Sequence, residues 1–358
     1  MKFGGSSVAS AERMWEVAQI VCSFPEQLPC VVLSAMGKVR AAAEKRARLS
    51  RTGRLPRQQR DSPLCPAPRR AAPTPLPPSR PSLPPQTTNL LLQAGEEALL
   101  TPPESIASLA PLRAIKELHR ETADKLAVDR ATRAEVEALL TQLQQLLVGI
   151  SIMQDLTPRA KDSLVSFGER LSTRLFAAFL AAQGVPARQH DAYAIGITTS
   201  DNFCNAEVNY ELTLPAVREA LTQAPGAPRH LPIVTGFLGK GLQTGAITTL
   251  GRGGSDLTCT LIGAALDLPE VQVWKDVDGV LTSDPRIVDC ARPVPSLTFE
   301  EATELAFFGA TVLHPLAMQP AQENGRMGVR VKNSYNRCAG LGWACGADRR
   351  GLTSSRPP

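Results

Sequence analysis

The chain has 358 residues, 43% of them hydrophobic and only 4% aromatic, which is enough for one large α/β domain or two small ones with an aliphatic core. The net charge of +5 is local, because residues 39–86 hold eleven Lys/Arg and two Asp/Glu, so the rest of the chain sums to −4. Because the rest of the chain is mildly acidic, we expect no nucleic-acid partner. We also expect no membrane span, because no apolar run reaches roughly 18 residues.

The first motif, KFGGSSV at residues 2–8, precedes a helix that apolar spacing predicts over residues 9–21. Gly4 and Gly5 would let the backbone approach a ligand closely, and we expect the serines to open the helix, whose free N–H groups suit an anion. Lys2 adds a cation at the same place. The motif is not a Walker A loop, and a plain glycine turn with serine caps explains it equally well when it is taken alone.

A short apolar strand is predicted over residues 29–34, in the sequence CVVLSAMGK, and a tract at residues 39–86 follows it. The tract holds eleven Pro and almost no Ile, Val or Phe. Such a composition cannot bury enough apolar surface to offset its ordering entropy, so we expect disorder there. A nucleic-acid or membrane tail is the alternative, but no aromatics are interleaved and no amphipathic period is present.

Globular patterning resumes after the tract. TTNLLLQAGEEALL, at residues 87–100, predicts an amphipathic helix capped by its threonines, and residues 106–147 predict one long helix or two. In SFGERLS, residues 166–172, we expect a turn followed by Glu169 in the first turn of a helix. A glutamate there is often a partner of the helix dipole, but in a pocket it could accept the ammonium of an amino acid.

TTLGRGGSD, at residues 248–256, is the most specific stretch of the chain. Arg252 lies between two glycines, and Ser255 and Asp256 are predicted to start a helix. A guanidinium can hold a carboxylate through two parallel hydrogen bonds, and glycines leave backbone amides accessible to an anionic oxygen. We therefore interpret this loop as a binding site for an anionic group rather than as a plain turn.

WKDVDGVLTSDPR, at residues 274–286, ends a predicted strand with polar and turn residues, which suits a nucleotide at the carboxyl edge of an α/β sheet or an ordinary capped turn. His314, in FGATVLHP, has no neighbour at metal-ligand spacing, so we expect a structural histidine and no metal ligand. Strands alternate with helices, which favours a mostly parallel sheet covered on both faces. The strands are predicted at 232–237, 271–275 and 328–332, and the helices at 256–267, 299–307 and 315–323.

The eight cysteines are scattered and form no CxxC pair, and some, such as Cys30 and Cys259, lie in apolar runs. A disulfide framework is not typical of a chain this long. We therefore expect reduced, buried thiols.

These motifs, in this order, resemble the catalytic domain of aspartate kinases in the amino-acid kinase superfamily, of a plant or algal type. The matching segments cover residues 1–336 apart from the tract: KFGGSSV, VVLSAMGK, TTNLLL, SFGERLS, TGFLGK, TTLGRGGSD, WKDVDGVLTSDPR, FGATVLHP and RVKNSYN. The resemblance implies a three-layer α/β/α sandwich with a mostly parallel central sheet. It also implies transfer of the γ-phosphoryl of ATP to the side-chain carboxylate of L-aspartate, the first step toward lysine, threonine and methionine.

The resemblance assigns roles to single residues. The catalytic residues would be Lys2, which stabilises the transferring phosphoryl, and Asp256, which orients Lys2. ATP would be bound by Lys2, Gly4, Gly5, Ser34, Lys275, Asp276 and Arg286, and aspartate by Thr88, Glu169, Arg252 and Ser255. Mg²⁺ would be held mainly by the ATP phosphates and water, with no metal site on the protein.

The resemblance also implies a domain organisation. Residues 1–38 and 87–336 would form the catalytic domain, because the family runs directly from SAMGK to TTNLLL. We interpret residues 39–86 as a disordered insert, a retained intron or gene-model error, and residues 337–358 as an aberrant disordered tail. We expect the regulatory ACT-type domains, and hence feedback control, to be absent, and a homodimer stays open.

Two alternatives to an active aspartate kinase remain at this point. One is a catalytically impaired isoform or gene-model artefact, and the other is an amino-acid kinase with another substrate, such as glutamate or acetylglutamate. We expect no targeting peptide in this chain, and a plastid location if the source is photosynthetic, otherwise a cytoplasmic one.

Overall fold

The structure is a computed structural model that describes residues 1–24, 26–37, 86–224, 226–277, 279–283, 288, 291–292, 294–307, 313–335 and, for the backbone alone, 343–346. These residues belong to one compact unit, Met1–Lys38 together with Pro85–Pro358. The predicted disorder of residues 39–86 falls outside the described residues except at Gln86. Within the predicted tail, residues 343–346 form a strand, and the rest of the tail lies outside the described residues.

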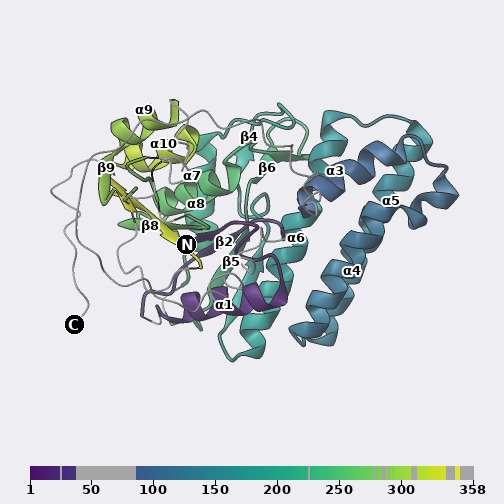
Figure 1. The fold of residues 1–358 in the computed structure, drawn as a ribbon, viewed down its shortest axis with the longest axis horizontal. Helices are drawn as coiled ribbons and strands as arrows, with labels where there is room; N and C mark the ends of the chain where they lie inside the picture. Colours follow the sequence, from purple (N-terminus) through teal and green to yellow (C-terminus); the bar gives the residue numbers. More distant parts are fainter. Residues whose placement is uncertain are drawn as a thin grey trace, which may run out of the picture. The chain divides into compact units, whose positions relative to one another are not determined.

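Eleven strands and ten helical segments alternate along the described residues (Figure 1). The strands are β1 (Lys2–Phe3), β2 (Val31–Leu33), β3 (Ala187–His190), β4 (Thr198–Thr199), β5 (Leu231–Thr235), β6 (Leu238–Gly241), β7 (Ile247–Thr249), β8 (Glu270–Lys275), β9 (Ser296–Thr298), β10 (Gly328–Asn333) and β11 (Trp343–Gly346). The helices are α1 (Ala11–Cys22), α3 (Thr87–Ala98), the 3-10 helix η1 (Pro103–Ser108), α4 (Ala110–Lys125), α5 (Arg130–Met153), α6 (Pro158–Ala182), α7 (Tyr210–Leu221), α8 (Gly254–Ala265), α9 (Phe299–Phe307) and α10 (Pro315–Asn324).

The main sheet has the strand order β3-β5-β2-β1-β8-β10-β11-β9, and a small second sheet joins β4, β6 and β7. Every described pair in the main sheet is parallel except β10 with β11. Because β1 lies between β2 and β8, the loops after these three strands meet at one edge of the sheet. This edge is where open parallel sheets bind ligands.

The sheet separates two apolar cores, as the alternation of side chains along each strand requires. Val31 and Leu33 face a core that they share with α1, α3, α4, α5 and α6, whereas Val32 faces a core shared with α7, α8, α9 and α10. Figure 1 shows α1 and α6 on one side of the strands and α7 and α8 on the other. The three-layer α/β fold with a mostly parallel sheet, predicted from the sequence, is confirmed.

Helix α5 is long and apolar enough, by length and composition alone, to cross a membrane, so the expectation that no segment reaches that length is wrong on this measure. Its buried residues include Leu139, Leu140, Leu143 and Leu147, which belong to the same core as α4 and α6. The leucines therefore fill a core between helices, and such a core helix passes the same test of length and composition.

Two local predictions are wrong in detail. Helix α1 begins at Ala11 and is capped by Ser10, whose hydroxyl accepts from the Arg13 backbone N–H, so the serines of KFGGSSV lie in the preceding turn. Helix α3 has Gln86 at its N-cap without a side-chain cap, so the threonines do not cap it. The prediction of one long helix or two over residues 106–147 is confirmed as two helices, α4 and α5, although the segment begins within η1 and α5 continues to Met153.

The thiol prediction is confirmed only in part. Among the described side chains all cysteines are free, with Cys30 and Cys259 buried but Cys22 and Cys204 exposed.

Candidate active site

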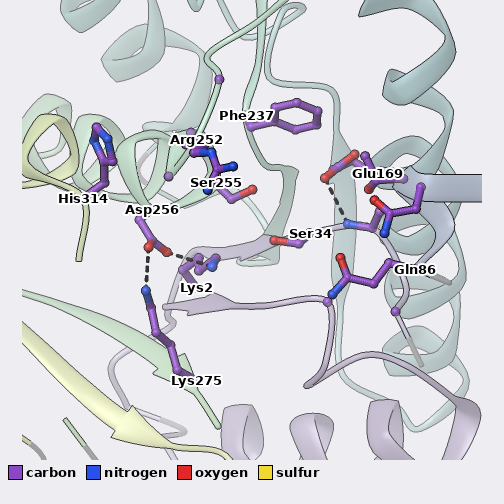
Figure 2. A pocket seen from close by; sticks show the side chains of 18 residues that line it. Lys2, Ser34, Gln86, Glu169, Phe237, Arg252, Ser255, Asp256, Lys275 and His314 are labelled. Atoms are coloured by element: carbon purple, nitrogen blue, oxygen red, sulfur yellow. Dashed lines mark hydrogen bonds and ion pairs between the residues drawn. The ribbon is translucent and has the colours of Figure 1, made fainter. Parts of the chain in front are cut away.

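A cavity of about 830 Å³ opens at the carboxyl edge of the sheet, where the loops after β1, β2 and β5 meet the first turns of α3 and α8 (Figure 2). It is lined by residues from nearly every motif of the sequence. The predicted site residues that line it are Lys2, Gly5, Ser34, Thr88, Glu169, Arg252, Ser255, Asp256 and Lys275. Segments more than 250 residues apart therefore converge on one pocket.

Asp256 joins two lysines on one side of the pocket. Its Oδ1 lies 2.7 Å from Lys2 Nζ and its Oδ2 accepts from Lys275 Nζ at 2.9 Å. Lys2 and Asp256 are buried, with 7% and 4% of their surfaces exposed. Burial alone would favour the neutral carboxyl, but the two ammonium groups together hold the pKa of Asp256 below its ordinary value. The carboxylate thus keeps two cations side by side, facing the cavity.

The fold dictates this arrangement. Lys2 and Lys275 come from the neighbouring parallel strands β1 and β8, and Asp256 lies in the first turn of α8, which packs beneath both. An acidic side chain in the first turn also suits the positive end of the helix dipole. The prediction that Ser255 and Asp256 start a helix is confirmed, since α8 begins at Gly254.

Gly5 is required by a close approach between two loops. A Cβ at Gly5 would lie 2.6 Å from the Ala35 carbonyl oxygen, and Gly37 N donates to the Gly5 carbonyl at 3.1 Å. Any other residue would separate the loop after β1 from the loop after β2. Lys2 in β1 and Ser34 just after β2 adjoin these loops, so this glycine keeps both side chains on the same pocket.

Glu169 lies on the opposite side of the pocket, in the middle of α6. The prediction that a turn precedes it is therefore wrong, because α6 begins eleven residues earlier, at Pro158. One carboxylate oxygen accepts from Ala35 N at 3.0 Å, and the other, Oε2, has no hydrogen-bond partner among the described residues. Burial raises the pKa of Glu169 to about 8, against the opposing effects of the Ala35 N–H and the Lys2 charge.

A buried carboxylate with an unpartnered oxygen is costly unless a ligand completes its hydrogen bonds. Thr87, next to the pocket residue Thr88, has a buried hydroxyl that also lacks a partner within the described residues. Of these two residues only Glu169 lines the cavity, as expected if a polar ligand supplies the missing partner of its Oε2.

Arg252 lies on the exposed loop between β7 and α8 and forms no ion pair within the described part of the chain. The glycines around it have a structural reason that the sequence did not suggest. Gly253, the N-cap of α8, has φ +74°, and a Cβ there would lie 2.6 Å from the Cβ of His314. The loop is therefore tightly packed as well as open to a ligand.

Three predicted residues are not placed in the pocket. Gly4 lies just behind it, where a Cβ would stand 3.7 Å from Lys2 Nζ, and Asp276 is exposed just after β8. Arg286 lies outside the described residues.

Phe237, in the TGFLGK segment, was not predicted as a pocket residue. His314 was predicted to have a structural role only. Phe237 has φ +48°, and such a backbone conformation in a bulky residue was the missing signal. His314 lines the cavity, and its Nδ1 accepts from Leu316 N at the start of α10.

The pocket has the chemistry of a site for a phosphate ester and a zwitterionic diacid. Lys2 and Lys275 present two ammonium groups to an anion, Arg252 presents a guanidinium, and Glu169 offers a carboxylate to a cation. These donors fit a nucleotide polyphosphate with its Mg²⁺, since phosphate oxygens would occupy the ammonium side and hold the metal themselves. Among the described residues, no group of three His, Cys, Asp or Glu side chains could hold a metal ion.

A sequence model of the amino acid kinase family matches residues 1–333. The chain is 51% identical over 336 residues to aspartokinase 3, chloroplastic, of Arabidopsis thaliana, and the alignment covers 94% of this chain and 51% of that protein. It is 34% identical over 254 residues to the aspartokinase of Schizosaccharomyces pombe, covering 70% of this chain and 48% of the relative. The chain thus spans about half the length of these curated relatives.

Solved structures of other proteins have folds similar to that of this chain. The crystal structure of E. coli aspartokinase III in complex with aspartate and ADP has a TM-score of 0.72 and 31% identity, and covers 97% of this chain and 64% of that chain. The Clostridium acetobutylicum aspartate kinase has a TM-score of 0.68 at 22% identity, covering 97% of this chain and 62% of that chain, and supports the fold alone.

Proposed function

Because this chain belongs to the amino acid kinase family, we propose that it transfers the γ-phosphoryl of ATP to the side-chain carboxylate of L-aspartate, giving 4-phospho-L-aspartate. The observation that carries the proposal is one pocket that joins the Lys2–Asp256–Lys275 group to Arg252 and Glu169. Relatives that are 49–51% identical to the chain are aspartokinases, and one similar structure holds aspartate with ADP.

The proposed mechanism needs no general base. The side-chain carboxylate of aspartate is ionised at neutral pH, since its ordinary pKa is about 4. Rate enhancement therefore depends on aligning two anions and neutralising the charge that surrounds the transferring phosphoryl. Lys2 would stabilise that phosphoryl, and Asp256 would hold Lys2 in place. Lys275, Gly4, Gly5 and Ser34 would bind the ATP phosphates, with Asp276 and Arg286 as further nucleotide contacts.

The substrate would be held by its other charged groups. Arg252 and Ser255 would bind a carboxylate, Glu169 would accept the ammonium, and Thr88 would contact the substrate from α3. Mg²⁺, when bound with ATP, would supply further charge neutralisation on the phosphates. This assignment supplies the unpartnered Oε2 of Glu169 with a hydrogen-bond donor, the substrate ammonium.

A test is the release of ADP by the purified chain with ATP, Mg²⁺ and a panel of acids, with the acyl phosphate trapped as its hydroxamate. We expect hydroxamate with L-aspartate and none above background with L-glutamate or N-acetylglutamate. Equal or better turnover with either of the latter acids would replace aspartate kinase with another activity of the family.

A wider biological role follows from the same proposal. The product would enter the biosynthesis of lysine, threonine and methionine, and the location would be the plastid, since curated relatives at 49–51% identity are described as chloroplastic.

A further inference from the structure

Asp162 is a buried carboxylate outside the pocket, with 1% of its surface exposed and no ion-pair partner among the described residues. Three protein donors satisfy it instead. Oδ2 accepts from the backbone N–H groups of Cys204 at 2.9 Å and Thr249 at 3.0 Å, and Oδ1 accepts from the Thr249 hydroxyl at 2.7 Å. A buried acid with this many convergent donors fixes the segments that supply them.

Both segments that Asp162 joins are connected to Arg252: Thr249 precedes it in the chain, and residues 204–206 pack against the same loop. Ala206 N donates to the Thr249 carbonyl at 2.9 Å, so residues 204–206 run beside the end of β7. Gly251 has φ +66°, and a Cβ there would stand 2.5 Å from Asn205 Oδ1. Gly251 therefore packs directly on a segment that Asp162 holds, one residue before Arg252.

Asp162 and Glu169 belong to the same helix, α6, seven residues apart. Residues at this spacing lie two turns apart on one face. One rigid helix therefore carries the acceptor for the substrate ammonium and also fixes the loop of the guanidinium.

From this geometry we propose that Asp162 is a positioning residue, which sets the separation between Arg252 and Glu169 and thereby the affinity for the diacid. The inference rests on the proposed function, since it takes the substrate to be held between these two side chains. Asp162 does not touch the substrate and acts through Thr249, Cys204 and Gly251.

The variant Asp162→Asn shows whether the hydrogen bonds of Asp162 or its negative charge matter, because it removes only the charge. In Asp162→Asn, the amide oxygen can accept from both backbone N–H groups and the NH₂ can donate to the Thr249 hydroxyl, which is able to accept. In Asp162→Ala all three contacts disappear. We therefore expect Asn to preserve the site and Ala to loosen it.

The experiment uses the full chain and measures the Kd of L-aspartate in the presence of MgADP, and the Kd of MgADP alone, by titration calorimetry. We expect Asp162→Ala to raise the aspartate Kd about tenfold or more, because small displacements of binding groups are costly, while the MgADP Kd stays within about twofold. Asp162→Asn should stay within about threefold of the parent for both ligands.

Asp191→Ala is the matched control. Asp191 also binds α6, through Arg174 at 3.1 Å, but contacts neither Cys204 nor Thr249 and does not line the pocket. We expect it to lower stability without changing the aspartate Kd. An equal loss of aspartate affinity in both alanine variants, or a parallel loss of MgADP affinity, would overturn the proposal.

Hydrogen exchange tests, without any substrate, whether Asp162 positions the loop that carries Arg252. We expect the amides of residues 251–255 to exchange faster in Asp162→Ala than in the parent or in Asp191→Ala. Unchanged exchange there refutes the role of Asp162. If the parent fails to bind aspartate, the proposed function fails, whereas the exchange data still decide whether Asp162 positions the loop.

Discussion

At the Glu169 side chain, burial and ligand binding act in opposite directions. Burial raises the pKa of Glu169 to about 8, so near pH 7 the side chain is mostly neutral in the free protein. An ammonium ligand favours the carboxylate, and binding should therefore expel the proton. If Glu169 binds the substrate ammonium, as proposed, the same residue makes substrate binding depend on pH.

We predict that aspartate binding at pH 7 releases close to one proton, and that aspartate affinity rises with pH up to about 8 and then levels. Calorimetry in two buffers of different ionisation enthalpy measures the proton count. Glu169→Gln should abolish the release and weaken binding. A wild-type proton count near zero would contradict the raised pKa.

The same shift has a consequence for stability. Because the folded-state pKa lies above the unfolded value of about 4.5, the contribution of Glu169 to stability is fully present below that value and is lost as pH rises through about 8. Glu169→Gln should therefore raise Tm more at pH 9 than at pH 5, as thermal unfolding at the two pH values would show.

We predict that Arg252→Ala raises the half-saturating aspartate concentration about a hundredfold, through loss of a charge-assisted hydrogen-bonded contact, and leaves the MgADP Kd unchanged. Arg113→Ala, which removes an exposed arginine on α4 outside the pocket, is the control. Unchanged aspartate saturation in Arg252→Ala would remove this side chain from the site.

Single residues also show how far the sequence could lead. Arg252 was predicted from the sequence because an arginine among three glycines makes a poor structural loop, whereas the roles of Lys2 and Asp256 came from the family resemblance. Phe237 was missed because its signal is a backbone angle, and the setting of Glu169 was misjudged because SFGERLS contains a glycine that suggests a turn. In the structure Gly168 is a contact point within α6, and a sequence does not show such contacts.

At the scale of elements, α6 joins the apolar core to the site. Its Leu171, Leu175 and Phe176 are fully buried in the core, while Glu169 faces the pocket. A Cβ at Gly168 would stand 2.6 Å from Ala35 Cβ, so α6 packs directly against the loop after β2. Periodicity predicted some elements, such as β8, β10 and α9, but not the short strands β3 and β4 or helix α7. The boundaries that depend on packing were not predicted either, as the missing threonine cap of α3 also shows.

Two glycine-to-alanine changes test this packing. In an open helical position, alanine is favoured over glycine by about 0.5–1 kcal/mol. Gly149, in α5, has nothing within 4 Å of the position that an added methyl group would take, so Gly149→Ala should raise Tm. Gly168→Ala should lower Tm and slow turnover, because the methyl displaces Ala35 and its hydrogen bond to Glu169. Tm values of Gly149→Ala and Gly168→Ala that shift in the same direction would contradict this prediction.

At the scale of the whole molecule, the described residues on either side of the tract lie together. Thr87 N donates to the Met36 carbonyl at 3.2 Å, and both Gly37 and Gln86 line the pocket. Because lengthening a loop costs little entropy, about 0.6 kcal/mol per doubling, we expect the fold to tolerate the tract. The family order of the motifs was readable from the sequence, and the family is confirmed, but the interpretation of residues 39–86 as an intron stays a prediction.

We predict that the chain turns over aspartate more slowly than a variant lacking residues 39–86, because Gly37 and Gln86, at the two ends of the tract, line the pocket together with Ser34 and Thr88. Both proteins should bind MgADP with similar Kd. Steady-state kinetics of the two proteins gives the comparison, and equal kcat/KM values would show that the tract leaves the reacting groups in place.

The hydrogen bond from Thr87 N to the Met36 carbonyl joins the two chain segments that place Gly37 and Gln86 at the cavity. An environment-sensitive fluorophore attached at Gln86, which is exposed and lines the cavity, would sit where an entering substrate changes the local solvent. The tract could therefore be replaced by a short labelled peptide, turning the protein into an optical sensor for its own ligand.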